Sequence, residues 1–242
     1  MTRSRGDRVD GGAVPVDYDT DPGRFAANAL STALFSRDGD IHAEVAERLV
    51  ARPCSLVLDV GGGTGALARL LLDVGVRTVV ADRARHVARA PGAAVRADAQ
   101  ALPFRDGVFD GAAALWMLHH VPDPGAALVE VFRVLRPGGV LAVSTSSRRN
   151  DPELAWALPR WGRASSFDAE EAPRLLERVF RVDEVRTWNA PLVTLPDHHA
   201  VALFLRGRGL SERDAAHRAR AVRVPLSLTK RGLVAWAHKP SR

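Results

Sequence analysis

Short runs of apolar residues alternate with amphipathic stretches of helical length through the middle of the chain. The first apolar run predicts a buried β-strand over residues 56–60, which breaks into a glycine-rich turn and opens a helix over 64–72. Further elements are predicted as strands over 77–82, 94–97, 109–117 and 140–144, and a helix over 124–135. Strands that alternate with helices in this way favour parallel βαβ units with right-handed crossovers.

The pattern is looser on both sides of this alternating region. A helix over 22–50 is predicted on the N-terminal side, with these residues facing inward: Phe25, Leu30, Leu34, Val45, Leu49 and Val50. On the C-terminal side we predict helices over 169–179 and 197–206, and strands over 180–188 and 232–237. One α/β domain results, with a disordered N-terminus (1–15), an N-terminal helical cap (16–50), a core (51–147), and a lid with C-terminal strands (148–242).

The composition suits a single domain of this kind, since 46% of the 242 residues are hydrophobic and 26% are charged. No run of about 18 apolar residues occurs, so we expect no transmembrane helix. No apolar segment follows the Arg-rich N-terminus, as a secretory signal requires. A single cysteine, Cys54, excludes a disulfide framework or a cysteine-based metal cluster, and His198-His199 has no partner at metal-ligand spacing. We therefore expect a cytoplasmic protein without a metal or a membrane partner.

The net charge of +6 is concentrated at the C-terminal end. Residues 200–242 hold ten basic and two acidic residues, and arginines follow a predicted helix and its flanks: Arg206, Arg208, Arg213, Arg218, Arg220 and Arg223. Two interpretations stay open, a solvated basic face or a surface for an anionic substrate or RNA. Only Lys230 and Lys239 among the 34 basic residues are lysine, a usage typical of GC-rich coding bias, which weakens the case for a nucleic-acid partner.

Gly61, Gly63 and Gly65 form a Gly-x-Gly-x-Gly turn between the first strand and its helix. Such a turn lacks Cβ atoms and lets a ligand lie against the backbone. The dinucleotide fingerprint Gly-x-Gly-x-x-Gly has its third glycine one residue later, with a pyrophosphate on the helix N-terminus. The shorter spacing argues against a pyrophosphate, although a glycine-rich turn alone is equally typical of a strained connection.

Two aspartates follow the next two strands, Asp82 after the second and Asp98 after the third. A carboxylate at the position of Asp82 can accept hydrogen bonds from both ribose hydroxyls of an adenosine, or it can cap the following helix. Asp98 can accept a hydrogen bond from the adenine amine, or it can stabilise a turn. Because the carboxyl ends of parallel strands meet at one edge of a sheet, we expect both side chains near the glycine turn.

With the motifs that follow, the region 55–147 resembles the class I S-adenosylmethionine-dependent methyltransferases, close to the ubiquinone/menaquinone-biosynthesis branch that includes many natural-product enzymes. The matching motifs, in family order, are residues 59–65, Asp82, 98–110, 118–124 and 133–139. The resemblance implies a Rossmann-like methyltransferase fold: a mostly parallel seven-stranded sheet with helices on both faces and a small cap. It also implies that 51–147 binds S-adenosylmethionine, with S-adenosylhomocysteine as the product.

The same resemblance implies which residues bind the cofactor. The glycine turn would contact its methionine part and ribose, Asp82 the ribose, Asp98 and Ala99 the adenine, and the backbone at Leu115 and Trp116 the methionine amino group. The full set is Asp59, Gly61, Gly62, Gly63, Gly65, Asp82, Arg83, Asp98, Ala99, Leu115 and Trp116. Trp116-Met117 is bulkier than the residues common in the family at this place, which would reshape the floor of the pocket.

Methyl transfer from a sulfonium is an in-line displacement that depends mainly on alignment and exclusion of water. A base helps when the acceptor is a phenol, an alcohol or an acidic carbon. His119 and His120 lie just past the fourth predicted strand and are candidates for this base, although adjacent side chains diverge, so at most one should face the acceptor. The alternative is that His119 caps a helix or shapes the pocket.

Aromatic residues gather in the predicted lid. Trp156 and Trp161, with Tyr18 from the N-terminal segment, are candidates for the substrate site, since an aromatic cap suits a planar or apolar acceptor. The alternative is that the lid aromatics form a small core of their own and that Tyr18 is an anchor.

We therefore predict methyl transfer to a small-molecule acceptor at oxygen, nitrogen or carbon, in a biosynthetic or natural-product pathway. An RNA or protein methyltransferase that uses the basic C-terminal surface, or a non-catalytic S-adenosylmethionine-binding protein, are the alternatives. The motifs leave the acceptor and the oligomeric state open.

Overall fold

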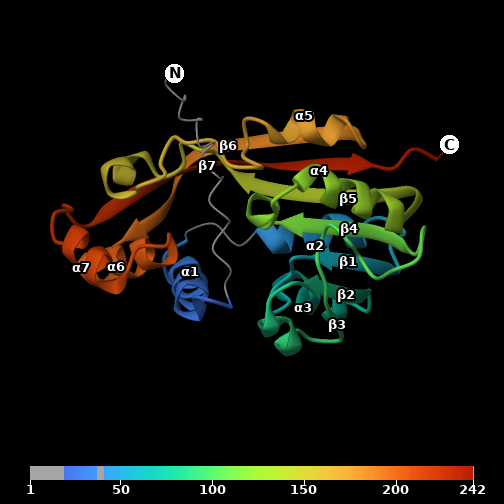
Figure 1. The fold of residues 1–242 in the computed structure, drawn as a ribbon, viewed down its shortest axis with the longest axis horizontal. Coiled ribbons are helices and arrows are strands. Elements are labelled where there is room, and N and C mark those ends of the chain that lie inside the picture. Colours follow the sequence, from blue (N-terminus) through green and yellow to red (C-terminus); the bar gives the residue numbers. More distant parts are fainter. Residues whose placement is uncertain (1–18, 37–40, 242) are drawn as a thin grey trace, which may run out of the picture.

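The computed structural model describes residues 19–36 and 41–241, and within them a seven-stranded sheet runs through the molecule (Figure 1). Its strand order is β3-β2-β1-β4-β5-β7-β6. The strands are β1 (Leu56–Val60), β2 (Arg77–Asp82), β3 (Ala93–Arg96), β4 (Phe109–Leu115), β5 (Leu135–Ser146), β6 (Arg181–Leu195) and β7 (Leu226–His238). The first five are parallel, and β7 is antiparallel to both of its neighbours. This confirms the predicted fold class.

The strand order reverses next to β1, which pairs with β2 on one side and with β4 on the other. In an open parallel sheet a ligand binds outside the carboxyl ends of the strands at such a reversal. The fold therefore places the glycine turn after β1, Asp82 at the end of β2, and the histidine pair after β4 at one edge.

Helices cover both faces of the sheet. On one face, α2 (Ile41–Val50) and α3 (Ala66–Asp73) bury Leu49 and Leu67 against β1, β4 and β7. On the other, α4 (Pro124–Val134) and α5 (Ala172–Glu177) bury Leu128 and Leu176 against the same strands. Three short 3₁₀ helices complete the core and its edge: η1 (Arg85–Arg89), η2 (Leu118–His120) and η3 (Pro152–Ala157).

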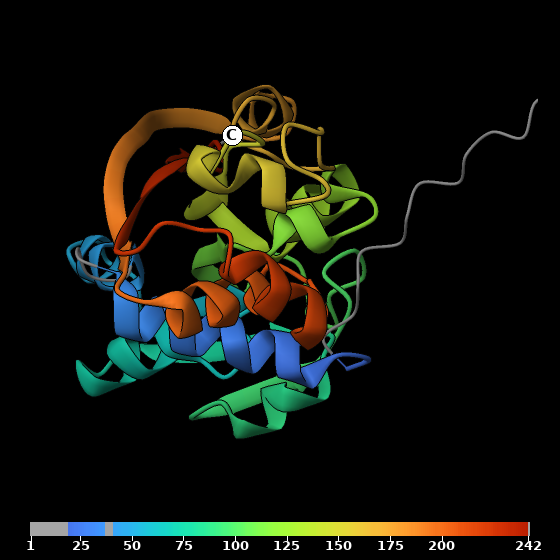
Figure 2. The same ribbon diagram turned by 90° about the vertical axis from the view of Figure 1, so that its left-hand side faces the viewer.

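Three helices form a cap where β6 ends and β7 begins. In it, α1 (Pro22–Phe35) lies beside α6 (His198–Gly207), and α7 (Glu212–Ala219) packs on α6 (Figure 2). Its own apolar cluster includes Phe204, Leu205 and Leu228. The contact between α1 and α6 is tight at Gly207, where a Cβ atom would lie 2.8 Å from the Cα of Asn28. The small residues at this crossing fix how α1 lies over the sheet edge.

The N-terminal helix prediction needs correction. The expected helix over 22–50 is two helices, and residues 37–40 between them lie outside the described residues, as do Tyr18 and the segment 1–15. Val45 and Leu49 are buried as predicted, but Leu30 and Leu34 are 49% and 60% exposed, and Val50 is exposed too. The reason is that α1 turns its small residues Ala27 and Ser31 inward at the α6 crossing.

The last three strands are longer than predicted. β5 begins at Leu135, directly after α4, because Leu135 already pairs with Phe109 of β4, and Gly138 and Gly139 then exchange hydrogen bonds with Lys239 just past β7. β6 continues to Leu195 through Pro191, where a bulge takes up the proline. β4 ends at Leu115, two residues early, because Trp116 has a φ of 58°. No helix among the described residues has the length and hydropathy needed to cross a membrane.

Candidate functional site

The glycine turn connects β1 to α3 at the reversal of strand order. Gly61, Gly63 and Gly65 have φ angles of 65°, 57° and 78°, a left-handed conformation that side chains other than glycine rarely adopt. The Gly61 N–H donates to the carbonyl of Ala81 (2.6 Å), which ties the turn to the end of β2. The sequence therefore folds here into a turn whose shape requires its glycines.

The glycines differ in what lies against them. A Cβ atom added at Gly61 would lie 2.6 Å from the Met117 side chain. One added at Gly62 would lie 2.3 Å from the Asp59 carboxylate, and one added at Gly65 would lie 2.6 Å from Pro91. At Gly63 the nearest atoms are at ordinary contact distance, 3.4 Å to His86 and 3.7 Å to Phe25. The protein's own packing thus requires the other glycines, whereas at Gly63 the left-handed conformation, rather than a close contact, requires a glycine.

Asp82 supports the turn from the end of β2. The Gly63 N–H donates to its Oδ2 (2.9 Å) and the Ala84 N–H donates to its Oδ1 (2.8 Å). Each oxygen has a second lone pair, so two acceptor positions are left for the hydroxyls of a ribose. The carboxylate is only half-buried. It therefore stabilises the turn before η1 and is also placed to bind a ligand beside Gly63.

The other predicted adenosine contacts lie on the next strands. Asp98 accepts two hydrogen bonds from Gln100 at Oδ1, from the backbone N–H (2.9 Å) and from the side-chain amide (3.2 Å). Ala99 is buried beside it in the core. Arg83 is exposed, and its carbonyl accepts from the Arg96 Nε (2.8 Å). Asp98 Oδ2, at the same edge as Asp82, accepts no hydrogen bond from the part of the chain that the structure describes.

Asp59 is buried beneath the glycine turn. Its Oδ2 has no hydrogen-bond partner among the described residues. Burial raises the pKa of Asp59 to about 7, and His42, which lowers it, only partly offsets this. An unpaired buried carboxyl is costly, and a positively charged ligand group near the turn would favour its ionised form.

The end of β4 forms the floor of the site. Leu115 is buried, and the Trp116 N–H donates to the carbonyl of Ser144 on β5 (3.1 Å). The Trp116 ring meets the ring of Trp188 edge to face, with centroids 5.8 Å apart. The strained φ of Trp116 thus turns its ring toward β6 and leaves the Met117 side chain against Gly61.

His119 and His120 lie on η2, just past this floor. Their ring centroids are 4.1 Å apart, so the expectation that the two side chains diverge is wrong. Burial, then His120, Arg208 and Arg24, hold the pKa of His119 well below its usual range, and burial lowers the pKa of His120 to about 4. The Nδ1 of His119 is shielded from solvent and has no hydrogen-bond partner in the described part of the chain. The direction of both pKa shifts favours neutral imidazoles at pH 7.

The predicted substrate residues of the lid take separate places. Trp156 is 56% exposed on η3, and Trp161 donates its indole N–H to the carbonyl of Asn150 (2.9 Å). Phe167 is buried in the main core and Phe204 in the cap core. The lid aromatics therefore serve largely as core residues, and a substrate role for Trp156 and Trp161 stays a prediction.

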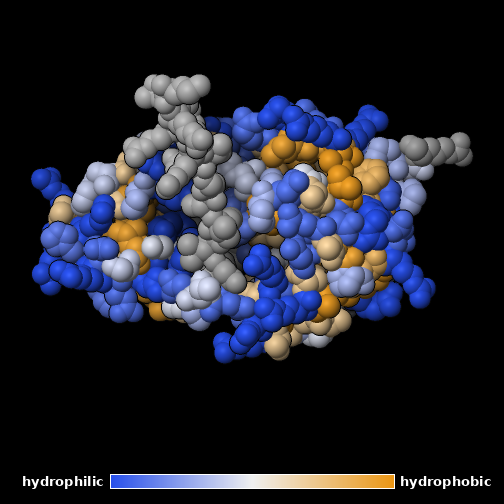
Figure 3. Space-filling view, in the orientation of Figure 1, coloured by the Kyte–Doolittle hydropathy of each residue, from blue (hydrophilic) through white to orange (hydrophobic). Residues whose placement is uncertain are grey.

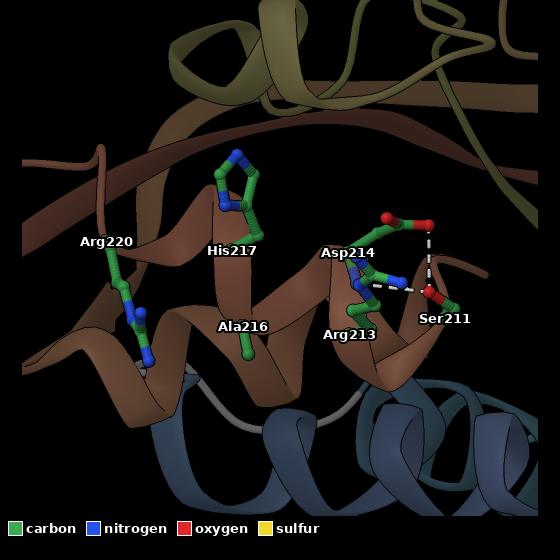
Figure 4. Close-up of a pocket in the computed structure, with 6 residues that line it drawn as sticks. All are labelled: Ser211, Arg213, Asp214, Ala216, His217 and Arg220. Carbon is green, nitrogen blue, oxygen red and sulfur yellow. Dashed lines mark hydrogen bonds between the residues drawn. The ribbon is translucent and has the colours of Figure 1, made fainter.

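The basic C-terminal stretch forms an outer surface. A hollow there is lined by Ser211, Arg213, Asp214, Ala216, His217 and Arg220. Figure 4 shows that all of them come from α7 and its capping residues, with Ser211 hydrogen-bonded to Asp214. None of the predicted site residues lines it. In the space-filling view, hydrophilic side chains cover much of the visible face, while hydrophobic ones gather near α4 and α5 (Figure 3).

Two features of the site escaped prediction from the sequence. Phe25 of α1 stacks on His86 of η1, with ring centroids 4.4 Å apart, beside Gly63. Asp151, Lys230 and Arg208 form a charged cluster beneath the cap. Asp151 precedes a proline and Lys230 is one of two lysines, but no local pattern links residues so far apart. His198 donates a hydrogen bond from Nε2 to the Val222 carbonyl (3.0 Å), and no metal-binding group occurs among the described residues.

Comparison with known proteins places this site in a family. A model described as a methyltransferase domain matches residues 58–143. A ubiquinone/menaquinone biosynthesis C-methyltransferase of Dinoroseobacter shibae is 30% identical over 186 residues, 68% of this chain and 69% of the relative. A malonyl-[acyl-carrier protein] O-methyltransferase of Pseudescherichia vulneris is 33% identical over 199 residues, 78% of this chain and 76% of the relative.

Coverage of other relatives is lower. A ubiquinone/menaquinone biosynthesis C-methyltransferase of Roseobacter denitrificans is 32% identical over 162 residues, and the match spans 65% of its length. Among solved structures, the [4+2]-cyclase SpnF has a TM-score of 0.66 at 21% identity, covering 93% of this chain and 95% of that one. The fold is thus shared with an enzyme named for a different reaction, so the fold alone does not decide the chemistry.

Proposed function

Because the chain belongs to the class I S-adenosylmethionine-dependent methyltransferases, we propose that it transfers a methyl group from S-adenosylmethionine to a small-molecule acceptor. The observation that carries this proposal is the arrangement around Gly63: a left-handed turn with no side chain of its own, beside acceptor positions of the Asp82 carboxylate that the N–H groups of Gly63 and Ala84 leave unused. One relative is named a C-methyltransferase of ubiquinone/menaquinone biosynthesis, which supports a small-molecule acceptor, and another is named a malonyl-[acyl-carrier protein] O-methyltransferase.

The residues present fit the cofactor. Gly63 gives its backbone room, Asp82 would accept from the ribose hydroxyls, and Asp98 with Ala99 would meet the adenine. The Asp59 carboxyl beneath the turn would favour the cationic methionine end, because its unpaired oxygen gains from a nearby positive charge. When bound, the cofactor supplies an activated methyl group on a sulfonium.

The cap supplies the acceptor side. We propose that α1, α6 and η3 cover the edge beyond β4 and exclude water from the methyl group, as displacement at a sulfonium requires. His119 lies on the wall of this space. A neutral imidazole whose pKa lies well below its usual range is a poor general base. His119 therefore acts by shaping the wall and orienting the acceptor.

The cofactor assignment is tested with a matched pair of glycine variants. Gly63→Ala and Gly75→Ala each put a side chain at a positive φ, 57° and 84°, so both strain the backbone by about 1–2 kcal/mol. No atom lies within 4 Å of a Cβ at Gly75, whereas a Cβ at Gly63 enters the proposed cofactor space. Calorimetry with S-adenosylmethionine should show affinity lowered about tenfold or more by Gly63→Ala only. Equal affinities in the two variants would contradict the assignment.

Turnover separates the alternatives. Release of S-adenosylhomocysteine is measured with panels of phenols, amines, quinols and carboxylic acids, and with total RNA and protein as competing acceptors. Small-molecule turnover is expected. Cofactor binding without turnover on any acceptor would indicate a non-catalytic protein, and turnover on RNA with steep salt dependence would indicate an RNA enzyme.

A further inference from the structure

A charged cluster lies beneath the cap, on the acceptor side of the sheet edge. The Lys230 ammonium on β7 contacts Asp151 Oδ1 at 2.6 Å, and the Arg208 Nε, just past α6, lies 3.5 Å from Asp151 Oδ2. The side chain of Asp151 is 2% exposed, that of Lys230 16%, and that of Arg208 32%. Three elements that are far apart in sequence therefore meet at a single buried carboxylate.

Of the two cations, Arg208 has the weaker ion pair, since its contact with Asp151 is longer than that of Lys230 (3.5 against 2.6 Å). Among the described residues, Asp151 is the carboxylate that contacts both cations, and it also accepts from the side-chain amide of Asn150. The other polar contact of Arg208 is neutral, from Nη1 to the Asn28 side-chain oxygen on α1 (3.1 Å). Glu153, whose carboxylate accepts from the N–H and hydroxyl of Thr229 next to Lys230, adds a second negative charge near that lysine. The incompletely paired donors of the cluster are therefore those of the Arg208 guanidinium, whose Nε has no hydrogen-bond partner among the described residues.

The surroundings shield part of the two cations from water. The Phe204 ring lies beside both cations, 4.6 Å from the Arg208 guanidinium carbon and 5.4 Å from the Lys230 nitrogen. The Arg208 Nε is shielded from solvent and makes no hydrogen bond within the described residues. Asp151 is held in a left-handed conformation (φ 57°), with its N–H donating to the Thr229 carbonyl (3.1 Å). A strained, desolvated arrangement of this kind is typical of binding sites rather than of fold stabilisation alone.

The cluster lies near His119 at the edge of the sheet that carries the proposed active site. The charge of Arg208 contributes to the lowered pKa of His119, so the two side chains lie close enough to interact through space. The burial of Lys230 lowers its pKa to about 8, and an added anion would raise it again. The Ser147 N–H, just past β5, donates to the Arg231 carbonyl (2.9 Å), so Lys230 lies beyond the carboxyl end of β5, at the edge of the sheet where β4 also ends.

We propose that Lys230 and Arg208 form an anion subsite that anchors a carboxylate group of the methyl acceptor. The proposal rests on the function proposed above and narrows the acceptor to small carboxylic acids. The planar fork of an arginine pairs with a carboxylate through two parallel hydrogen bonds, and a lysine beside it adds a third donor. The carboxylate orients the acceptor while another of its atoms, or an oxygen of the carboxylate itself, meets the methyl group.

The chain offers a direct probe, because Lys230 and Lys239 are its only lysines. In protein grown with ¹³C-labelled lysine, two side-chain signals report on the two sites. Lys239 donates to the carbonyls of Phe132 and Leu135 (2.8 and 2.7 Å), on the core side, and is the internal control. The full chain with S-adenosylhomocysteine is titrated at low salt and pH 7 with butyrate and benzoate, with the matching amides, and with phosphate.

The carboxylates should shift the Lys230 signal saturably, and the Lys239 signal should not shift. Binding of the amides should be at least about tenfold weaker than binding of the carboxylates. Arg208→Gln should weaken carboxylate binding about tenfold, the effect of losing a hydrogen bond to a charged group. Arg213→Gln, at the outer hollow of α7, is the matched control and should leave it unchanged. Lys230→Met, checked by thermal melting, should remove the preference for acids over amides in calorimetry.

Several outcomes would overturn the proposal. They are an unshifted Lys230 signal with every acid, equal shifts for acids and amides, carboxylate binding unaffected by Arg208→Gln, or tighter binding of phosphate than of either carboxylate. If S-adenosylhomocysteine binds and methyl transfer proceeds while Lys230 stays unshifted, the subsite is wrong and the proposed function stands. If the cofactor fails to bind, the proposed function itself is wrong.

Discussion

Replacing Asp82 by alanine removes the carboxylate that we assign to the cofactor ribose, and the structure sets the size of the effect. The two oxygens of Asp82 have four acceptor positions, of which the N–H groups of Gly63 and Ala84 take two. Two positions are left for two ribose hydroxyls. A hydrogen bond to a charged group contributes about 1.5–3 kcal/mol, so the loss of both is at least about 3 kcal/mol. That corresponds to a loss of affinity of roughly 100-fold or more.

The assay is calorimetric titration of S-adenosylmethionine into wild type, Asp82→Ala and Asp82→Asn. The asparagine variant keeps one acceptor oxygen, so its affinity should fall between the other two. Asp106→Ala is the control, because its side chain is 80% exposed and pairs with Arg133 away from the glycine turn. An affinity within about threefold of wild type for a folded Asp82→Ala protein would refute the ribose assignment.

Two further predictions concern buried titratable groups. His119→Ala should lower kcat more than it lowers affinity for S-adenosylmethionine, and the pH profile of kcat at saturating cofactor should show no inflection from His119 between pH 6 and 8, since both histidines stay neutral there. An inflection near 6.5 that His119→Ala abolishes would show a base. The pKa of Asp59 is raised to about 7 from an unfolded value of about 3.9, so its contribution to stability is full below pH 4 and is lost as the pH rises through 7. The stability of Asp59→Asn relative to wild type should therefore increase as the pH rises through that range, by at most about 4 kcal/mol. The measurement is denaturant unfolding of both proteins without cofactor, and parallel curves of stability against pH would contradict the raised pKa.

The core of the site could be predicted because its determinants are local. A buried apolar run, glycines at positive φ and an aspartate at the next strand end lie within about thirty residues of one another, and parallel strands bring their carboxyl ends together. The expected strands at Leu56–Val60 and Arg77–Asp82 match the structure. The sequence does not show which glycines are required by packing. In the structure, Gly61, Gly62 and Gly65 are crowded by Met117, Asp59 and Pro91, respectively.

The cap could be predicted only in outline, because long-range pairing decides its structure. The run 189–195 contains Asn189 and Pro191, which disfavour a strand, yet its pairing with β7 overrides that preference. Leu30 and Leu34 looked like core residues by helical spacing, but α1 turns Ala27 toward α6. Hydrophobic periodicity identifies an apolar face of a helix without showing which neighbouring element will cover it.

The lengths of β6 and β7 bear on how the two halves of the site work together. From Gly232 to His238, β7 pairs with both β5 and β6, whereas from Leu226 to Arg231 it continues with β6 alone and enters the cap. Lys230 lies on this continuation, and Trp188, which packs on Trp116 at the end of β4, pairs with Gly232 where the two parts join. A continuous two-stranded ladder resists bending more than a loop does, because bending breaks ladder hydrogen bonds. The distance between the cofactor edge and the Lys230 cluster is therefore set by the sheet itself. Substitutions at the junction of Trp188 and Gly232 should accordingly alter the length of the preferred acceptor, whereas substitutions in the exposed loops of the cap should not.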